Sequence, residues 1–225
     1  MPASERGFTG KPAAIAGLAL AFGWTLLFTI PGISAHRLTS VRDEISNISI
    51  KWAVLAVLCV LVFAVRRWTP AELGIRGLRW GDVLAACGAF VIAFALSGAA
   101  SHLVAMPRSL SDLHKLAAVP LSLRFGLVLT AALSEEFMYR GYGIEELKHL
   151  TGSYPIAGLL SLLVFTVSHA WIYGFSRSLI VPALVGAVLT GLYLWRKNLG
   201  ACMLMHFLMD GCLLLVLPAV VSASR

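Results

Sequence analysis

The sequence predicts an all-α fold, a polytopic bundle of transmembrane helices, and two observations lead to it. The first is composition: 59% of the residues are hydrophobic, 13% are charged, and the mean hydropathy is +0.85, which lies outside the usual range of soluble proteins. The second is the length of the uncharged stretches, because residues 12–35 and 83–106 contain no Asp, Glu, Lys or Arg. Each stretch is longer than the roughly 20 residues needed to cross about 30 Å of hydrocarbon. Lipid offers backbone groups no hydrogen-bond partner, so such spans are expected to be helices.

The other candidate spans are almost as apolar. The segment 48–65 contains Lys51, whose side chain we expect to extend toward the membrane interface. The segment 116–139 contains Arg124 and two glutamates. Together the segments predict about seven spans, or eight if one long segment is split, in a single integral membrane domain over residues 1–225. In chain order the spans are Pro12–Ala35, Ile48–Val65, Val83–Met106, Leu116–Tyr139, Tyr154–Phe175, Ser178–Trp195 and Leu199–Ser224.

The charge pattern points to a membrane rather than to nucleic acid. The formal net charge is +7, and basic residues fall between the spans, as in Arg66-Arg67 and Arg196-Lys197. They form no basic domain interleaved with aromatic residues, so anchoring and orientation in the lipid bilayer explain them better than nucleic-acid binding does. The Lys/Arg excess favours a cytoplasmic N-terminus. The apolar run after Lys11 is longer than the core of a cleaved signal peptide, which predicts a retained first span.

Ionisable residues inside three of the spans are the main functional signal. Glu135 and Glu136 close an apolar run, and two later spans contain His169 and His206. Ionisable side chains within a membrane span are costly, so each is a candidate functional residue. Residues four apart lie on one face of a helix. This spacing relates three pairs: Glu136 with Arg140, Phe165 with His169, and His206 with Asp210.

The residue types suit hydrolysis of a peptide bond by water. Glu136 can pair with the arginine one turn later, whereas Glu135 is rotated by about 100° and is free to face a cavity. There Glu135 can act as a general base on water, and His169 can share that water or pass a proton to a leaving amine. His206 and Asp210 can stabilise a developing oxyanion. No covalent nucleophile is required.

Other interpretations of the same residues stay open. Glu135, His169 and His206 could instead hold a divalent metal such as zinc, since two imidazoles and one carboxylate form a familiar catalytic set with an open position. His206 and Asp210 could be the relay of a small proton-coupled transporter, although the halves of the chain show no repeat of polar positions. A non-catalytic immunity or scaffold protein is the third alternative. The residues alone do not decide between a metal-bound and a metal-free water.

Three motifs in one order also resemble a known family. The chain contains E-E-x-x-x-R-G at residues 135–141, F-x-x-x-H at residues 165–169, and H-x-x-x-D at residues 206–210. In this order and on three apolar spans, they resemble the CPBP intramembrane proteases, also called Abi. This family covers CAAX prenyl endopeptidases and bacteriocin-processing or self-immunity proteins. The resemblance covers residues 116–217, which would form the catalytic core.

The resemblance implies an intramembrane endopeptidase, with Glu135 as the base, His169 sharing activation of the water, and His206 with Asp210 as the oxyanion site. Glu136 and Arg140 would support them. Members are commonly labelled metalloproteases, yet a metal-free glutamate mechanism is also argued for the CAAX branch. That branch often has Asn in place of Asp210, and an ionised Asp accepts but does not donate, so it would act through the histidine. The implied partner is a membrane-embedded or lipid-linked peptide or protein, and the compact chain with short loops resembles a bacterial member located in the inner membrane.

Overall fold

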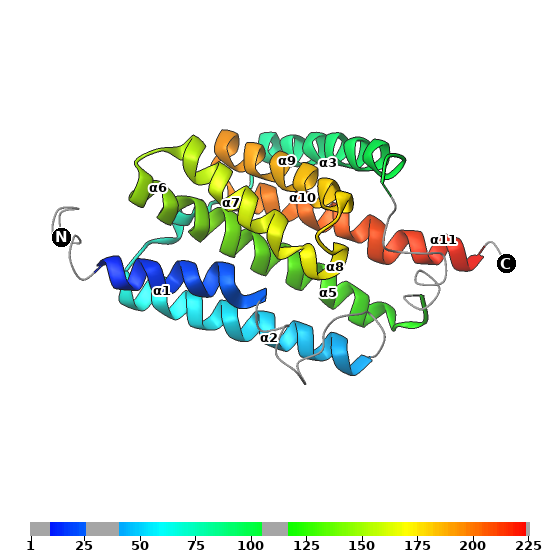
Figure 1. Ribbon diagram of the computed structural model, residues 1–225, viewed down its shortest axis with the longest axis horizontal. Coiled ribbons are helices and arrows are strands. Elements are labelled where there is room, and N and C mark those ends of the chain that lie inside the picture. The colour runs from blue at the N-terminus through cyan, green and yellow to red at the C-terminus, as the bar shows by residue number, and fades with distance from the viewer. Residues whose placement is uncertain (1–9, 26–40, 105–116, 224–225) are drawn as a thin grey trace.

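The protein is an elongated helical bundle. The computed structural model describes residues 10–25, 41–104 and 117–223. Within those ranges every regular element is a helix and no strand occurs, so the predicted all-α class is confirmed. Figure 1 shows that α1 (Gly10–Gly23) starts at one end of the bundle and that α11 (Leu217–Ala223) lies at the other. We call the end where α1 starts the N-terminal end.

Most spans combine an α-helix with a shorter helical segment. The helix α2 (Val41–Cys59) continues into the π-helix η3 (Val60–Val65), and a short 3-10 helix, η4 (Pro70–Leu73), leads to α3 (Trp80–Ser101). The longest helical run is α5 (Leu121–Glu135), the π-helix η5 (Glu136–Ile144) and α6 (Glu145–Thr151). The remaining elements are α7 (Tyr154–Ser168), α8 (Ala170–Tyr173), η6 (Arg177–Leu179), α9 (Ile180–Arg196), α10 (Leu199–Gly211) and the π-helix η7 (Cys212–Val216), which precedes α11.

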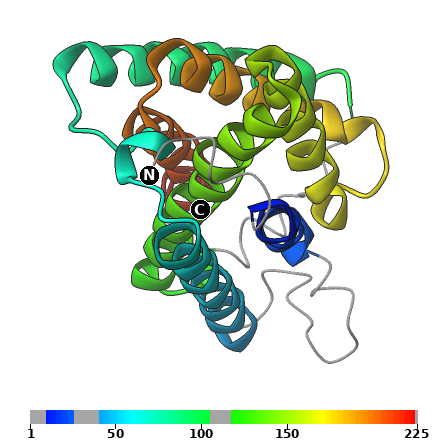
Figure 2. The same ribbon diagram turned by 90° about the vertical axis from the view of Figure 1, so that its left-hand side faces the viewer.

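The run from α5 to α6 forms the middle of the bundle. Helices α1 and α2 cover one side of it, and α10 packs against its other side and also against α3 and α9 (Figures 1 and 2). Helix α7 packs against α9 and η5. Residues that are far apart in the sequence therefore meet around η5.

Tight turns at the N-terminal end define where two helices start. Gly152 ends α6 with φ +73°, and α7 follows with Pro155 in its first turn, where a missing N–H costs nothing. Lys197 ends α9 with φ +50°, and the Asn198 side chain caps α10 by accepting a hydrogen bond from the Gly200 N–H at 3.0 Å. These short connections make α6 and α7, and α9 and α10, antiparallel neighbours.

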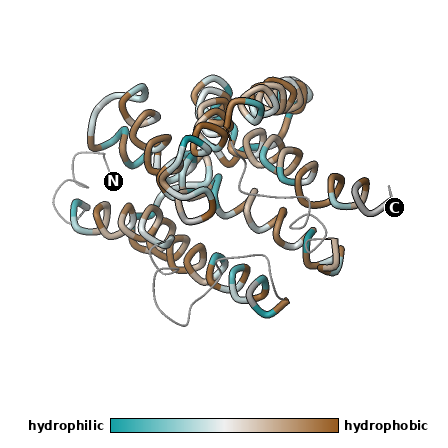
Figure 3. Tube along the Cα trace, turned by 45° about the vertical axis from the view of Figure 1, so that its right-hand side comes forward, coloured by the Kyte–Doolittle hydropathy of each residue, from teal (hydrophilic) through white to brown (hydrophobic). Residues whose placement is uncertain are grey.

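Several helices are suited to a membrane. Four of the described helices are long and apolar enough to cross one, and α1 and α7 are shorter apolar helices. Figure 3 shows apolar residues along most of each helix. On α7 an apolar stripe faces outward through Ile156, Leu159, Leu163 and Val167, each at least half exposed, as expected for contact with lipid. The long helices are Glu44–Val65, Trp80–Ser101, Arg177–Arg196 and Leu199–Val220.

The predicted span boundaries agree only in part with the helices. The predicted span 154–175 is not one helix, because α7 ends at Ser168 and a separate short helix, α8, follows. The segment 116–139 is too short, since the helical run continues to Thr151. Residues 26–35, 105, 106, 116 and 224 of the predicted spans lie outside the described residues. The number of about seven spans remains a prediction.

Candidate active site

Glu135 is the last residue of α5 and is held by a lysine from another span. Its side chain is 10% exposed, and its Oε1 accepts a hydrogen bond from Lys51 Nζ at 2.7 Å. The Lys51 ammonium also lies 5.2 Å from the ring centroid of Trp24, just after α1. The expectation that Lys51 reaches the membrane interface is therefore wrong. Lys51 points into the bundle, where Glu135 compensates the cost of burying its charge.

Glu136 is the first residue of η5, and its carboxylate contacts an arginine and a histidine. It is fully buried, and its Oε1 accepts from Arg140 Nη1 at 2.9 Å and lies 2.7 Å from His206 Nδ1. The predicted contact between Glu136 and Arg140 is present, although in a π-helical segment rather than an α-helix. Such π-helical segments frequently occur at functional sites. The change from α-helix to π-helix falls between the two glutamates. Their carboxylates have different partners: Lys51 binds Glu135, whereas Arg140 and His206 contact Glu136.

Arg140 connects η5 to α9 and α7. Its Nη2 donates to the Gly186 carbonyl at 3.3 Å, and its guanidinium lies 4.2 Å from the Phe165 ring centroid. Among the described residues, the buried Arg140 Nε and Glu136 Oε2 atoms have no hydrogen-bond partner. Buried polar atoms without a partner are rare in folded proteins, so these two atoms are a distinctive feature of the surroundings of η5.

His169 follows the last residue of α7, and its protonation pattern can be read from one contact. Its Nδ1 lies 2.7 Å from the Phe165 carbonyl oxygen. A carbonyl only accepts, so Nδ1 carries the hydrogen, and in the neutral ring Nε2 is the nitrogen that can accept a proton. The Phe165 ring packs against the imidazole with a centroid distance of 4.5 Å, as the four-residue spacing predicts. The chain turn at His169 thus presents a proton acceptor at a helix end.

His206 of α10 lies between two carboxylates. Its Nδ1 contacts Glu136, and its Nε2 lies 3.5 Å from Asp210 Oδ2 one turn later. The His206 side chain is 7% exposed, whereas the Asp210 side chain is 26% exposed. The predicted pair of His206 and Asp210 is present, and the contact with Glu136 joins it to η5 in one polar chain.

The structure brings the predicted site residues together in two linked groups. Glu136, Arg140, His206 and Asp210 form a chain of direct contacts. Glu135 lies within electrostatic range of His169 and His206 as well as of Lys51. Sequence reasoning missed Lys51 as a member of the site. The sequence did contain a signal for it. Lys51 is a charged residue inside an otherwise apolar span, so it is a candidate functional residue for the same reason as the two glutamates.

The arrangement does not fit the metal-binding alternative. In the part of the chain that the structure describes, no three His, Cys, Asp or Glu side chains gather in a set that could hold a metal ion. The predicted ligands Glu135, His169 and His206 are included in that statement. A positive ammonium 2.7 Å from the Glu135 carboxylate would also repel a second cation at that oxygen.

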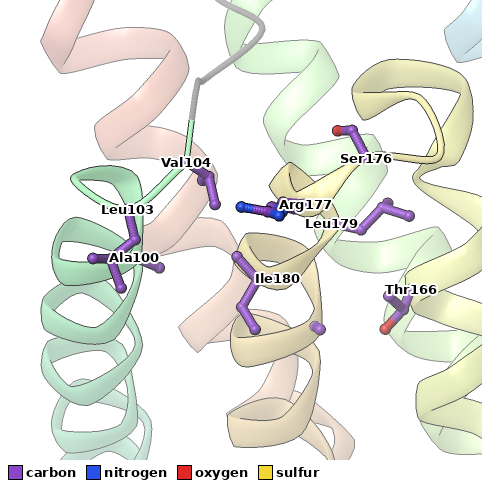
Figure 4. A pocket seen from close by; sticks show the side chains of 9 residues that line it. Ala100, Leu103, Val104, Thr166, Ser176, Arg177, Leu179 and Ile180 are labelled. Atoms are coloured by element: carbon purple, nitrogen blue, oxygen red, sulfur yellow. The ribbon is translucent and has the colours of Figure 1, made fainter.

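A pocket of about 610 Å³ lies beside the site but is separate from it. Thr166 of α7, three residues before His169, is part of its wall, and Arg177 of η6 points toward Val104 at the end of α3 (Figure 4). Apart from Thr166, Ser176 and Arg177 its lining is apolar, and none of the candidate catalytic residues contributes to it. The other lining residues are Ala100, Leu103, Ser176, Leu179, Ile180 and Ala183.

Comparison with known proteins supports the resemblance seen in the motifs. Residues 117–212 match the family described as type II CAAX prenyl endopeptidase Rce1-like. No curated protein and no solved structure matches the chain. The matched segment contains both glutamates, Arg140, His169, His206 and Asp210, and it lies within the predicted core of residues 116–217. The segment 117–212, which carries the candidate site, thus resembles the CPBP/CAAX protease family.

Proposed function

We propose that the protein is an intramembrane endopeptidase that cleaves a membrane-associated, lipid-linked protein with water as the nucleophile. The observation that carries this proposal is the buried Glu135 carboxylate. Lys51 binds its Oε1 at 2.7 Å, and His169 lies within electrostatic range. A carboxylate with one oxygen held in place has its other oxygen available for a water molecule. The family match supports an endopeptidase of the CAAX type in general.

In the proposed reaction Glu135 takes a proton from water as the water oxygen bonds to the scissile carbonyl carbon. The carbonyl oxygen becomes negative in the resulting tetrahedral intermediate. The proton then passes to the amide nitrogen, and the C–N bond breaks to give a new carboxylate and a free amine. His169 is suited to share the water and to pass the proton, because its Nε2 is the accepting nitrogen when Nδ1–H is bonded to Phe165.

His206 is the proposed donor to the developing oxyanion. With a hydrogen on both ring nitrogens, it donates through Nδ1 to Glu136, and its Nε2–H, 3.5 Å from Asp210 Oδ2, can turn to a substrate oxygen. Asp210 then acts by orienting the histidine rather than by donating itself. Arg140 holds Glu136 in place, and through it the histidine. Donors fixed before the reaction stabilise charge without the cost of reorganisation.

The substrate side of the proposal follows the family and the membrane setting. The family description names a CAAX prenyl endopeptidase, which acts near a C-terminal cysteine that carries a prenyl group. We propose a membrane-associated, lipid-linked peptide as the substrate class, and a prenylated peptide serves as its test compound. We further place the protein in a bacterial inner membrane with its N-terminal end in the cytoplasm. Arg66 contacts Gly10, where α1 starts, and Arg67, Arg76 and Arg79 follow it in the connection to α3.

The direct test uses purified protein in liposomes and an internally quenched peptide whose fourth residue from the C-terminus is a farnesylated cysteine. We expect cleavage by the wild type and loss of at least about a hundredfold in kcat for Glu135→Gln. Glu72→Gln is the matched control, since Glu72 is exposed and caps η4 through Thr69, away from Glu135 in the sequence. Equal cleavage by the wild type and Glu135→Gln would refute the proposal and favour an immunity or scaffold protein with an idle site.

A further inference from the structure

We infer that Lys51 is a positioning residue for Glu135, so that α2, which lies outside the family-matched segment, contributes to the active site. Lys51 is 8% exposed and its Nζ binds Glu135 Oε1 at 2.7 Å. The match to the family begins at residue 117. The inference rests on the proposed function of Glu135 and adds a residue that neither the motifs nor the family description names.

The ammonium has more than one contact that fixes it. It lies 5.2 Å from the Trp24 ring centroid, a distance at which a cation is attracted to an aromatic face. It is also within electrostatic range of His169. Lys51 is thereby held between the residue that follows α1 and the end of α5. A cation fixed in this way fixes the carboxylate oxygen that it binds, which determines where the second oxygen of Glu135 lies.

Charge compensation alone is the competing explanation of the pair. A buried carboxylate needs a partner wherever it lies, and breaking a buried ion pair destabilises a protein whether or not the pair serves catalysis. A positioning role predicts, in addition, an effect on the rate of the chemical step. Displacing the base by about 1 Å can reduce the rate about a hundredfold while substrate binding is unchanged. The two explanations therefore differ in kcat and agree in stability.

The same span provides a matched control. Arg66, which follows η3, binds Glu146 of α6 through Nη2 at 2.8 and 2.9 Å, and Glu146 is 1% exposed. This pair also joins the α2–η3 span to the α5–η5–α6 run, but at the N-terminal end, where Arg66 and Glu146 lie away from the candidate catalytic residues. Arg66→Met consequently removes a comparable ion pair without touching the base.

The experiment measures cleavage of the farnesylated quenched peptide in liposomes and heat stability in detergent for Lys51→Met, Lys51→Arg and Arg66→Met. We expect both methionine variants to lose heat stability. Only Lys51→Met should lose about a hundredfold in kcat, with KM within about twofold, because the peptide-binding surface is intact. The kcat of Lys51→Arg should be at least about tenfold higher than that of Lys51→Met, since arginine keeps a cation beside Glu135.

A double variant separates this inference from the proposed function and does not depend on the folding of Lys51→Met. Lys51→Met combined with Glu135→Gln removes both charges, so it should be more heat-stable than either single variant and no slower than Glu135→Gln alone. Near-wild-type kcat in Lys51→Met, with Glu135→Gln inactive, would overturn the positioning role and leave the proposed function standing. A double variant less stable than both singles would overturn the pair itself. Full activity of Glu135→Gln would instead overturn the proposed function.

Discussion

At the scale of single residues, the site is built from charges that neutralise one another inside an apolar bundle. Glu135 binds Lys51, and Glu136 binds both Arg140 and His206. A buried charge without a partner is costly, and removing one member of a buried pair typically destabilises by about 3–5 kcal/mol. The pairs therefore explain how glutamates persist in a membrane helix, and they also set the positions of Glu135 and His206, two of the groups with a proposed chemical role.

Arg140→Met should lower the free energy of unfolding by about 3–5 kcal/mol, because the buried Glu136 loses the guanidinium that binds its Oε1. The guanidinium is 1% exposed and also bonds to the Gly186 carbonyl. Heat stability in detergent measures the effect. Arg76→Met, at an exposed residue between η4 and α3, is the control and should stay within about 0.5 kcal/mol of the wild type. An equally small effect of Arg140→Met would contradict the structural role of the pair.

Chelation of metals should leave cleavage unchanged. The described carboxylates and imidazoles form no metal-binding set, and an ammonium occupies the position beside Glu135. Incubation of the liposome-embedded protein with 1,10-phenanthroline, followed by the peptide assay, tests this expectation. A loss of activity that added zinc restores, absent in a solvent-only control, would contradict the water mechanism proposed for Glu135 and favour the metal alternative.

Local contacts of the site were predictable from the sequence, and distant contacts were not. The pairs Glu136–Arg140 and His206–Asp210 lie four residues apart, so the geometry of a helix alone brings them together. The contacts Lys51–Glu135 and Glu136–His206 join different spans. Their formation depends on which helix faces pack together, and apolar spans that are hydrophobic all round carry little periodic signal to show it.

At the scale of elements, a close approach of α9 to α7 positions Arg140 and Phe165. A Cβ atom at Gly186 of α9 would lie 2.8 Å from the Phe165 ring and 2.9 Å from Leu162. Glycine therefore allows the two helices to meet where its carbonyl accepts from Arg140. Small residues serve this purpose in membrane helix packing generally.

Gly186→Ala should reduce both heat stability and kcat, since the added methyl group displaces Phe165 and, through it, Arg140 and His169. Overpacking of this kind typically costs about 1–3 kcal/mol. Gly191→Ala on the same helix is a matched control, because nothing lies within 4 Å of a Cβ at that position. It should be neutral or slightly stabilising through helix propensity. Equal behaviour of the two variants would show that the close approach does not matter.

The existence of the helices was easier to predict than their ends. Uncharged length identified the spans, because lipid leaves backbone no alternative to a helix. The end of α7 at Ser168 carried no strong signal, since Gly174 is the first helix-breaking residue after it. The break matters for function because it places His169, with its ring bonded to the last turn of α7, at a change of chain direction.

At the scale of the whole molecule, the two ends of the bundle differ in charge, which predicts its orientation. Arg66 contacts Gly10 at the start of α1, Arg67, Arg76 and Arg79 follow in the connection to α3, and Lys197 contacts Glu145 of α6. Basic residues favour the cytoplasmic side. In intact bacterial cells, Arg76→Cys should react with a membrane-impermeant maleimide only after permeabilisation. Leu103→Cys, exposed at the opposite end of α3, should react without it. The reverse pattern would contradict the proposed orientation.

The most direct test of the central claim is a comparison of protein termini in native membranes that contain the wild type or Glu135→Gln at equal levels, with Glu72→Gln as the control. If Glu135 activates water for peptide hydrolysis, new termini appear with the wild type and with Glu72→Gln and disappear with Glu135→Gln, and their sequences identify the substrate. Identical termini in all three membranes, with Glu135→Gln stably inserted, would contradict the assignment of this site to proteolysis.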